Sequence, residues 1–431
     1  MSGSIPRSIY LRTIPSGDQS ISFSRSYSKM SNITERFFRY ISVDTQSDEN
    51  TGTHPSTSRQ FDLCRILADE MRSMGMSNVR MDEEHCYVYG EIPANIETER
   101  TLGFISHMDT APGPSGDASK ARIVSSYDGG VIALNDSVSL DPAEFPEMKN
   151  YTGQDIIVTD GVSLLGADDK AGVTEIMSMA ERLLSDPSIR HGKIAIGFTP
   201  DEEIGEGTEF FDVEGFGVKC AYTVDGGAIG EIEYENFNAA TAFISIAGKE
   251  IHPGEAKGKM INAARIAGEF DRLLPQDQRP ECTEGYDGFF HLTKLEANVA
   301  AAEMQYIIRD HDPKLFDSKK DLMKAAADYI NAKYNGVLTL EIRDAYRNMK
   351  ELVEPHMYLI DDAKAAFEAC GVEPQVIPIR GGTDGAVLSY KGLPCPNLST
   401  GGHNFHSCQE YIPVQSLEKM VDVLVEIAKV K

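Results

Sequence analysis

The spacing of apolar residues divides the first half of the chain into alternating strands and helices. Apolar side chains recur at helical spacing in residues 32–47 and 57–76, where Asn32 can cap the first helix and Gly75 can end the second. The apolar runs expected to form strands are TLGFISH (101–107), DIIVTD (155–160), KIAIGFTP (193–200) and CAYTVDGG (220–227). Strands that alternate with helices in this way predict an α/β domain with a largely parallel sheet.

The pattern changes near Asn236. The segment ATAFISIAGKEIHPG (240–254) alternates apolar and polar residues, as a strand with one buried face does. Residues 260–274 and 321–334 have the spacing of amphipathic helices, and 292–312 and 336–348 read as further strands. From about Val353 the α/β pattern returns and runs to a terminal helix. We therefore expect a smaller α+β domain, residues 237–352, inserted into a catalytic domain made of residues 30–236 and 353–431.

Composition excludes several classes of protein. A chain of 431 residues exceeds what one core usually serves, which agrees with two domains. No apolar run approaches the roughly 18 residues needed to span a membrane. The net charge of −26 argues against a nucleic-acid partner, because such binding relies on Lys and Arg. Seven scattered cysteines without a C-x-x-C pair indicate neither a disulfide framework nor a structural zinc site, and they favour a reducing, cytoplasmic compartment.

Residues 1–29 differ in character from the rest. Four basic residues (Arg7, Arg12, Arg25 and Lys29) stand against the single acid Asp18, among many serines. This composition resembles a mitochondrial or plastid transit peptide. A disordered extension, or a true start at Met30, explains it equally well. An organelle is therefore the alternative location.

Residues able to bind metals follow several of the expected strands. In an open α/β sheet, ligands bind beyond the carboxyl ends of the strands. Each of these residues alone is more often a helix cap or a surface residue, but their coincidence at strand ends is hard to explain by capping. Histidines together with several carboxylates suit zinc, cobalt or manganese. The residues are His107, Asp109, Asp168, Asp201, Glu202, Glu203, Asp225, His403 and His406.

The adjacent aspartates in LLGADDKAGV (164–173) precede an expected helix. More carboxylates are available than one tetrahedral cation needs. A two-metal site, with cations roughly 3.5–4 Å apart and one shared carboxylate, would use them all. One aspartate of the pair is therefore a candidate bridge between two cations.

A set of motifs resembles the peptidase T family, the tripeptide aminopeptidases among the carboxypeptidase/aminoacylase family of di-zinc exopeptidases. The resemblance runs from about Met30 to the C-terminus. H-x-D and a later D-E-E mark the wider family, whereas TEGYDGF, ENFNAA and RGGTDG are specific to peptidase T. The other matching motifs are SHMDTAPG, GADDKAG, TPDEEIGEG, YTVDGG, HPGEAKG and IIRD.

This resemblance implies two zinc ions per subunit. His107 and Asp225 would bind one ion, Glu203 and His406 the other, and Asp168 would bridge them.

It also implies roles around the metals. Asp109 would orient the imidazole of His107, and Glu202 would act as the general base. A cis peptide bond would follow Asp168. His403 stands where relatives have an aromatic residue, so GGHNFHS offers two candidate histidines, of which we expect His406 to be the ligand.

Substrate binding calls for groups that hold a peptide terminus. Arginine binds a free carboxylate with two parallel hydrogen bonds, which makes Arg309 and Arg380 candidates, although either could be a structural ion pair. By resemblance, His252 would come from the inserted domain and polarise the scissile carbonyl, often in the partner subunit's site. Asn262 is a further polar candidate.

The alternating strand that leads to His252 needs its edge covered or paired. We therefore expect the inserted domain to be a dimerisation and lid domain, and the protein to be a homodimer that acts on small peptides. The expected activity is release of the N-terminal residue from tripeptides by zinc-activated water. A dipeptidase, an N-acyl-amino-acid hydrolase and a non-catalytic peptide-binding relative are the alternatives.

Overall fold

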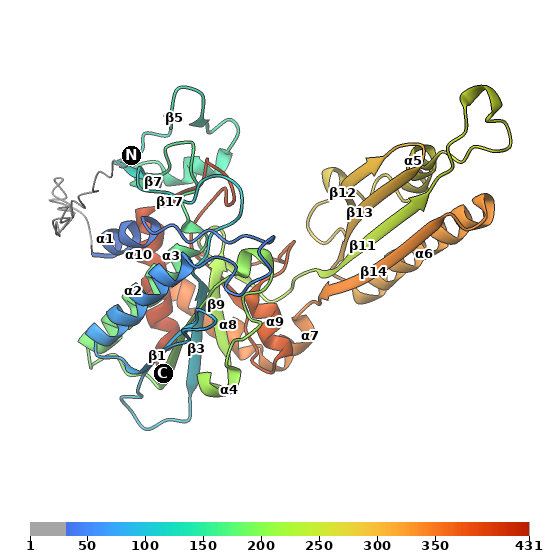
Figure 1. Cartoon of the computed structure of the whole chain (residues 1–431). Helices are drawn as coiled ribbons and strands as arrows, with labels where there is room; N and C mark the ends of the chain where they lie inside the picture. The colour runs from blue at the N-terminus through green and yellow to red at the C-terminus, as the bar shows by residue number, and fades with distance from the viewer. Residues whose placement is uncertain (1–31, 431) are drawn as a thin grey trace, which may run out of the picture.

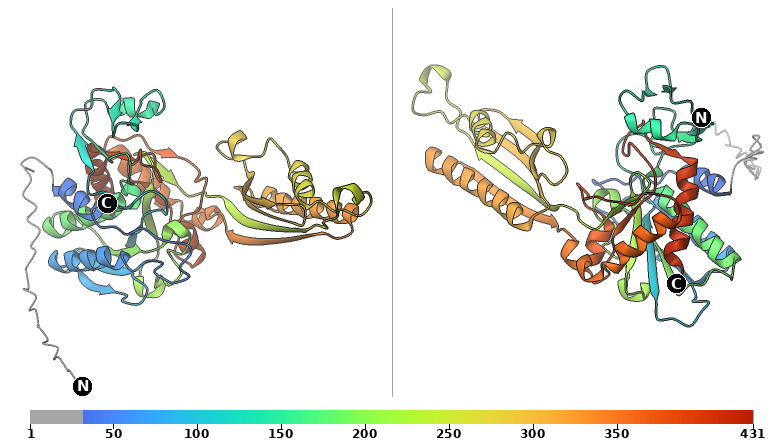
Figure 2. Two further views of the ribbon diagram at one scale, coloured as in Figure 1. Left: turned by 45° about the horizontal axis from the view of Figure 1, so that its top comes forward. Right: turned by 180° about the vertical axis from the view of Figure 1, so that it is seen from behind.

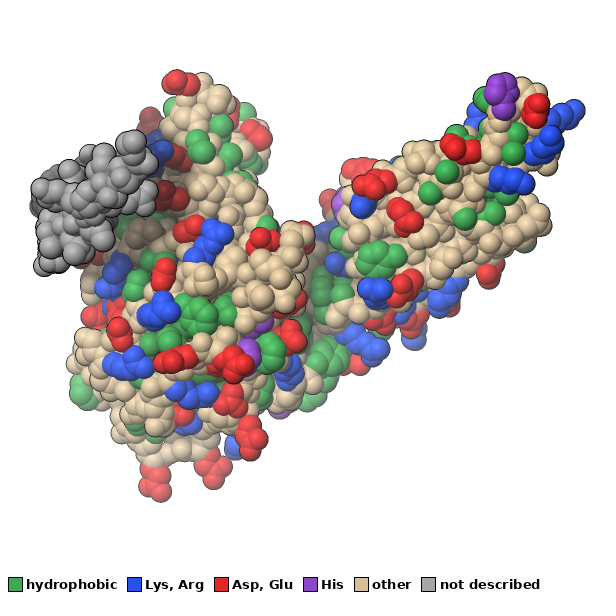
Figure 3. Space-filling view, in the orientation of Figure 1, with side chains coloured by type: hydrophobic (Ala, Val, Ile, Leu, Met, Phe, Trp, Pro, Cys, Tyr) green, Lys and Arg blue, Asp and Glu red, His purple; other side chains and the backbone are tan. Residues whose placement is uncertain are grey.

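The computed structural model describes residues 32–430 and consists of two bodies joined by a narrow connection (Figures 1 and 3). The larger body contains both ends of the described chain, and the smaller one projects from it as an elongated arm (Figure 2). The expected leader, residues 1–29, lies outside the described residues. Within residues 32–430, the helices are all too short or too polar to cross a membrane.

The larger body is built on a mixed sheet of eight strands in the order β1-β2-β8-β3-β9-β16-β10-β15. The pairs β8–β3, β3–β9, β9–β16 and β10–β15 are parallel, and the others are antiparallel. The expected α/β class with a mostly parallel sheet is confirmed. The strands are β1 (Ser77–Met81), β2 (Val88–Ile92), β3 (Thr101–His107), β8 (Lys193–Thr199), β9 (Ala221–Gly226), β10 (Glu231–Glu233), β15 (Gln375–Val376) and β16 (Asn397–Ser399).

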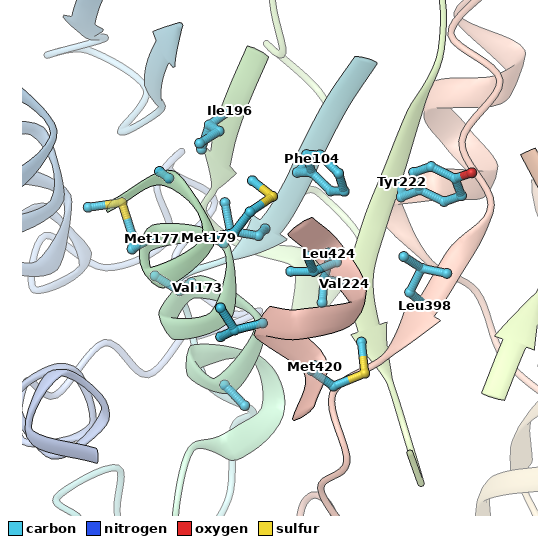
Figure 4. Packing of buried hydrophobic residues seen from close by; sticks show 14 of the residues in the cluster. Phe104, Val173, Met177, Met179, Ile196, Tyr222, Val224, Leu398, Met420 and Leu424 are labelled. Carbon is cyan, nitrogen blue, oxygen red and sulfur yellow. The ribbon is translucent and has the colours of Figure 1, made fainter. Parts of the chain in front are cut away.

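Successive residues of a strand point to opposite sides of the sheet, and both sides of this sheet are covered by a buried core. Phe104 belongs to the large core, which also contains residues of α1, α2, α3, α8 and α10, whereas Ile105 belongs to a core on the other side with residues of α4 and α9. Figure 4 shows the first of these cores, where α3 and α10 meet the sheet. The helices are α1 (Asn32–Ile41), α2 (Gln60–Ser73), α3 (Ala167–Ser185), α4 (Val213–Phe216), α7 (Lys350–Val353), α8 (Tyr358–Ala369), α9 (Asp384–Tyr390) and α10 (Val414–Ala428).

The arm is a separate antiparallel sheet of four strands in the order β12-β13-β11-β14, with two helices packed on it (Figure 1). The chain enters it at Asn238 and leaves it at Tyr346. The strands expected at 240–254, 292–312 and 336–348 are thus present. The elements are β11 (Asn238–Ala247), β12 (Phe289–Ala297), β13 (Ala301–Asp310), β14 (Leu338–Tyr346), α5 (Ala263–Leu273) and α6 (Pro313–Tyr334).

A third, small sheet corrects one expectation. The apolar run at 155–160 forms β7 (Ile156–Val158), which pairs with β4 (Arg122–Val124) and β17 (Tyr411–Pro413) and not with the main sheet. A short hairpin of β5 (Ile132–Ala133) and β6 (Ser139–Leu140) lies beside it. An apolar run indicates a buried strand but carries no information about its partner. Short 3-10 helices occupy Pro146–Tyr151, Glu202–Ile204, Pro253–Glu255, Pro280–Cys282 and Glu354–His356.

Candidate metal centre

The carboxyl ends of three neighbouring strands and two nearby turns bring the candidate ligands together. Strand β3 ends at His107, β8 is followed by the turn at Glu202–Ile204, and Asp225 lies near the end of β9. Asp168 lies in the first turn of α3, where its backbone is not helical, and His406 lies in the loop after β16. This is the edge at which open α/β sheets bind ligands.

Asp168 lies at the middle of the cluster. Its Oδ1 is 2.9 Å from His107 Nε2, and its Oδ2 is 3.0 Å from His406 Nε2. The two oxygens of one carboxylate thus face two different imidazoles. A carboxylate in this arrangement can bridge two cations.

The remaining carboxylates divide between the two imidazoles. Asp225 Oδ1 lies 3.4 Å from His107 Nε2, and Glu203 Oε2 lies 2.9 Å from His406 Nε2. The ligand atoms of His107, Glu202 and Asp225 lie within 4.8 Å of one another, and so do those of His107, Asp168 and Glu203. Glu202 and Glu203 therefore fall in different groups of potential ligands, which share His107, and only Glu203 also contacts His406.

Asp109 links two parts of the centre. Its Oδ1 is 3.2 Å from His107 Nδ1, which leaves Nε2 directed at Asp168. Its two carboxylate oxygens also accept the backbone N–H groups of Glu202 and Glu203, at 3.1 and 3.2 Å. One buried side chain thus orients the imidazole and holds the turn that carries both glutamates.

Asp169, the second aspartate of the pair, has a structural role, whereas Asp168 faces the two histidines. Asp169 accepts hydrogen bonds from the Ser106 hydroxyl, from the backbone N–H of His107 at 3.2 Å and from that of Gly172 at 3.2 Å. It therefore fixes the end of β3 against the start of α3. The Asp168–Asp169 peptide bond is cis, as the resemblance implies.

Glu410 is a buried residue of the centre that sequence reasoning missed. Its Oε2 accepts the N–H groups of Leu165 and Gly166 at 2.7 and 2.9 Å, and its Oε1 accepts that of Asp168 at 3.0 Å. This carboxylate holds the turn that presents Asp168. In the sequence it follows SCQ in a polar loop, where it looks like an ordinary surface acid.

Asp201 anchors the turn of the two glutamates from behind. Its backbone is left-handed (φ 53°), a conformation that Asp tolerates better than most residues. Its buried carboxylate accepts from Ser56 N at 2.6 Å and from Gln60 Nε2 at 2.6 Å. This side chain thus faces away from the metal centre, unlike Glu202 and Glu203.

The buried carboxylates of the cluster favour the binding of cations. Burial disfavours ionised Asp168, but hydrogen bonds from His107 and His406 outweigh it and hold the Asp168 pKa below its usual range. Hydrogen bonds to Asp168 and Glu203 raise the pKa of His406 to about 11. Burial raises the pKa values of Glu203 and Asp225 to about 7 each. Dications would favour the ionised form of these crowded carboxylates.

The residues fit a pair of divalent cations. Glu203 Oε1 is buried and has no hydrogen-bond partner within the described chain. A buried oxygen without a partner is costly, so this atom is suited to bind an ion. Imidazole nitrogens and carboxylate oxygens without thiolates are the ligands of catalytic zinc and similar metals.

Known proteins resemble this chain over nearly its whole length. It is 49% identical to peptidase T of Alkaliphilus oremlandii over 404 residues. The aligned residues make up 92% of this chain and 98% of that protein. The chain belongs to the peptidase T family of M20 metallopeptidases. A family model described as a peptidase dimerisation domain matches residues 234–337, which include most of the arm.

Solved structures share the fold of this peptidase T family member. An aminopeptidase PepT from Bacillus cereus has a TM-score of 0.72 at 24% sequence identity. A tripeptidase from Staphylococcus aureus has a TM-score of 0.74 at 20% sequence identity. Each comparison covers 92% of this chain and 97% of the other chain. A dinuclear metal-binding peptidase of the M20 family from Bacillus subtilis has 0.62 at 14% identity, with 92% and 96% covered. At these identities the likeness concerns the fold alone.

His403, the alternative to His406 in this peptidase T sequence, lies in a different environment. Its Nε2 is 2.6 Å from the Tyr151 hydroxyl, and its ring stacks on Tyr411 with 4.8 Å between centroids. Burial lowers its pKa to about 4. It lies in the same loop as His406 and packs against Tyr151 and against Tyr411 of β17 in the small sheet.

The two candidate arginines lie where the arm joins the catalytic domain. Arg309 donates to the carbonyls of Ala240 and Ile308, at 3.4 and 3.1 Å, and lies over the Tyr346 ring. Burial chiefly raises the pKa of Tyr346, although the neighbouring Arg309 lowers it.

Arg380 makes three hydrogen bonds to a single segment of the chain. It donates to the carbonyls of Gly285 and Asp287, at 2.7 and 3.0 Å, and to Thr283 Oγ1 at 3.0 Å. It thereby holds the segment TEGYDGF against the catalytic domain.

The other two candidates lie away from the centre of their own chain. Strand β11 begins at the domain junction, and its ten residues span about 30 Å at roughly 3.3 Å each. His252 follows its far end, is exposed and accepts a hydrogen bond from Gly254 N at 3.2 Å. Asn262 caps helix α5 by accepting from Arg265 N at 3.1 Å. Neither side chain joins the metal cluster within one chain.

Proposed function

We propose that this metallopeptidase removes the N-terminal residue from tripeptides, using two zinc ions. The observation that carries the proposal is the position of Asp168, whose two oxygens lie 2.9 and 3.0 Å from two different histidines. Membership of the peptidase T family, and the fold shared with an aminopeptidase and a tripeptidase, support the substrate class.

The residues divide into two proposed ligand sets that share Asp168. His107 and Asp225 would hold one zinc ion, and Glu203 and His406 the other. When bound, such a pair of ions lowers the pKa of a shared water molecule and polarises the carbonyl of the scissile bond. Asp109 would keep His107 Nδ1 engaged so that Nε2 is free to bind.

Glu202 is proposed as the general base. It would take a proton from the attacking water at its carboxylate and pass that proton to the nitrogen of the leaving amine. Burial, and in addition the charge of Asp225, raise the Glu202 pKa, which favours a group that accepts a proton and releases it again. The bond from Glu202 N to Asp109 fixes the base relative to His107.

Substrate length would be measured at the domain junction. We propose Arg309 as the group that binds the free carboxylate of the tripeptide, since its guanidinium lies over Tyr346 at the junction of the arm and the catalytic domain. Arg380 would act on the substrate through the TEGYDGF segment that it holds. Asn262, which caps a helix on the arm, stays a prediction.

The arm is proposed to form a homodimer and to bring His252 to the partner subunit's metal centre. Its match to a peptidase dimerisation domain supports the dimer. The boundaries 237–352 for the arm and a cytoplasmic location are part of the same proposal.

A direct test measures hydrolysis before and after removal of metal. Purified protein should release the N-terminal residue from tripeptides faster than from dipeptides, tetrapeptides or N-acetylated tripeptides. Exhaustive chelation should abolish the activity, and zinc should restore it. Preference for a dipeptide or an N-acyl amino acid would favour the alternative hydrolases. Activity that survives complete metal removal, verified by elemental analysis, would rule out the proposed mechanism.

A further inference from the structure

A second group of potential metal ligands lies outside the centre already described. It consists of His54, in the loop between α1 and α2, and of Glu206 and Glu209, which follow the turn at Glu202–Ile204. One ligand atom from each of these side chains lies within 4.8 Å of the other two. This trio shares no residue with the proposed two-zinc centre.

The His54 ring is held firmly in one orientation. Its side chain is 8% exposed. The ring stacks on that of Tyr87, with 5.8 Å between ring centroids, and lies 4.9 Å from the Phe210 ring, centroid to centroid. His54 Nε2 lies 3.2 Å from the Tyr87 hydroxyl oxygen, which also accepts the N–H of Phe210 at 3.2 Å. A hydroxyl oxygen has two lone pairs, so it can accept from Phe210 and from His54 Nε2–H together. In this tautomer, which a cation at Nδ1 requires, the Nδ1 lone pair is free to bind.

The other nitrogen of His54 is buried and lacks a hydrogen-bond partner in the described chain. The carboxylate oxygens that face it are Asp201 Oδ2 at 3.4 Å and Glu206 Oε2 at 4.0 Å. Asp201 already accepts from Ser56 and Gln60. Nδ1 is therefore directed at the side of the molecule where Glu206, which is 48% exposed, and the exposed Glu209 reach solvent.

We propose that His54, Glu206 and Glu209 form a third cation site that binds a divalent transition metal such as zinc. One imidazole nitrogen and two carboxylates are typical ligands for zinc, whereas calcium and magnesium prefer oxygen alone. Zinc bonds are roughly 2.0–2.2 Å long, so the two exposed glutamates must rotate inward, while the buried His54 stays in place. Water reaches the exposed side and completes the coordination.

The site would connect two separate segments of the catalytic domain. The loop around His54 also carries Ser56, which binds Asp201 at the start of the glutamate turn. The N–H of Glu206 in turn donates to the carbonyl of Asp201 at 3.0 Å. A cation between His54 and Glu206 therefore braces the turn that presents Glu202 and Glu203 from its outer side.

The test compares zinc binding by three proteins. Wild type, the double variant Glu206→Gln/Glu209→Gln and the control Glu97→Gln/Glu99→Gln are dialysed to equilibrium against the same zinc solution, at a concentration that saturates wild type. Bound zinc is then measured by elemental analysis. All four glutamates are exposed, so each variant should fold, and the control makes the same change in charge at a site without a histidine.

The third site predicts one fewer zinc ion per chain in Glu206→Gln/Glu209→Gln than in wild type, with the control equal to wild type. His54→Gln should also lose one ion. Equal zinc content in all of these proteins would overturn the site. The result rests on the difference between proteins, so it is independent of how many ions the proposed two-zinc centre holds.

Discussion

Glu202 and Glu203 are neighbours in the chain but fall in different groups of potential ligands, which share His107. Glu203 lies 2.9 Å from His406, whereas Glu202 groups with His107 and Asp225. This difference underlies the proposed division into a general base and a metal ligand. A change of one carboxylate to an amide keeps the size of the side chain and removes its charge, so the two variants can be compared directly.

Glu202→Gln should keep its zinc and lose turnover by about 10²–10⁴-fold, the usual contribution of a general base. Glu203→Gln should lose zinc from one of the two proposed positions. Metal content by elemental analysis and kcat for a tripeptide measure both effects. If Glu202→Gln loses the zinc and Glu203→Gln retains it, the two roles are reversed.

Glu410 is expected to position Asp168 without touching metal or substrate. In Glu410→Gln, an amide N–H₂ replaces one of the oxygens that accept from the 165–168 turn, so the turn should loosen. Changes behind a metal ligand typically weaken metal binding by about 10–100-fold. The apparent zinc affinity should fall, and saturating zinc should restore kcat, whereas the exposed Glu418→Gln should change neither. A kcat that stays low at saturating zinc would argue against a positioning role.

At the scale of elements, three buried asparagines hold the connection between the two bodies. Asn238 Nδ2 donates to the carbonyls of Asp310 and His311 at 3.0 Å each, and its Oδ1 accepts from Asn348 N at 3.1 Å. Asn236 Oδ1 accepts from Met349 N at 2.8 Å. Side-chain amides thus fasten the strands through which the chain enters and leaves the arm.

Asn238→Ala should lower the free energy of unfolding by about 1–3 kcal/mol, because it leaves buried backbone groups without partners. Urea unfolding measures the loss. Asn50→Ala, in an exposed loop, is the matched control and should be close to wild type. Equal stability of the two variants would mean that the junction does not depend on these hydrogen bonds.

The sequence could predict much of the fold but only part of the site. His107 and Asp225 were found because each lies at the end of a strand that reads clearly from its apolar run. Glu410 could not be found in this way, since it lies 242 positions from the Asp168 N–H that it accepts. The pairing of β7 with β17 was missed for the same reason, because periodicity says nothing about contacts between distant segments.

At the scale of the whole molecule, the arm carries His252 away from its own metal centre. The ten residues of β11 separate the domain junction from the loop that contains it. A role for His252 in catalysis therefore requires a second chain. Light scattering should report twice the 47.3 kDa chain mass, less any leader that is removed.

Mixed subunits test whether sites are shared. His252→Ala should depress turnover far more than zinc content, and Glu202→Gln should be nearly inactive. After dissociation and reassociation of the two variants together, part of the activity should return, because a mixed dimer contains one site with both residues intact. Active monomers, or normal turnover in His252→Ala, would reduce the arm to a spacer.

Anomalous diffraction at the zinc absorption edge, from crystals of the zinc-loaded protein, tests the two-zinc centre most directly. The account predicts two peaks roughly 3.5–4 Å apart on either side of the Asp168 carboxylate. One peak should lie beside His107 and Asp225, and the other beside Glu203 and His406. A single peak at Asp168, or two peaks that do not share this carboxylate, would contradict the account.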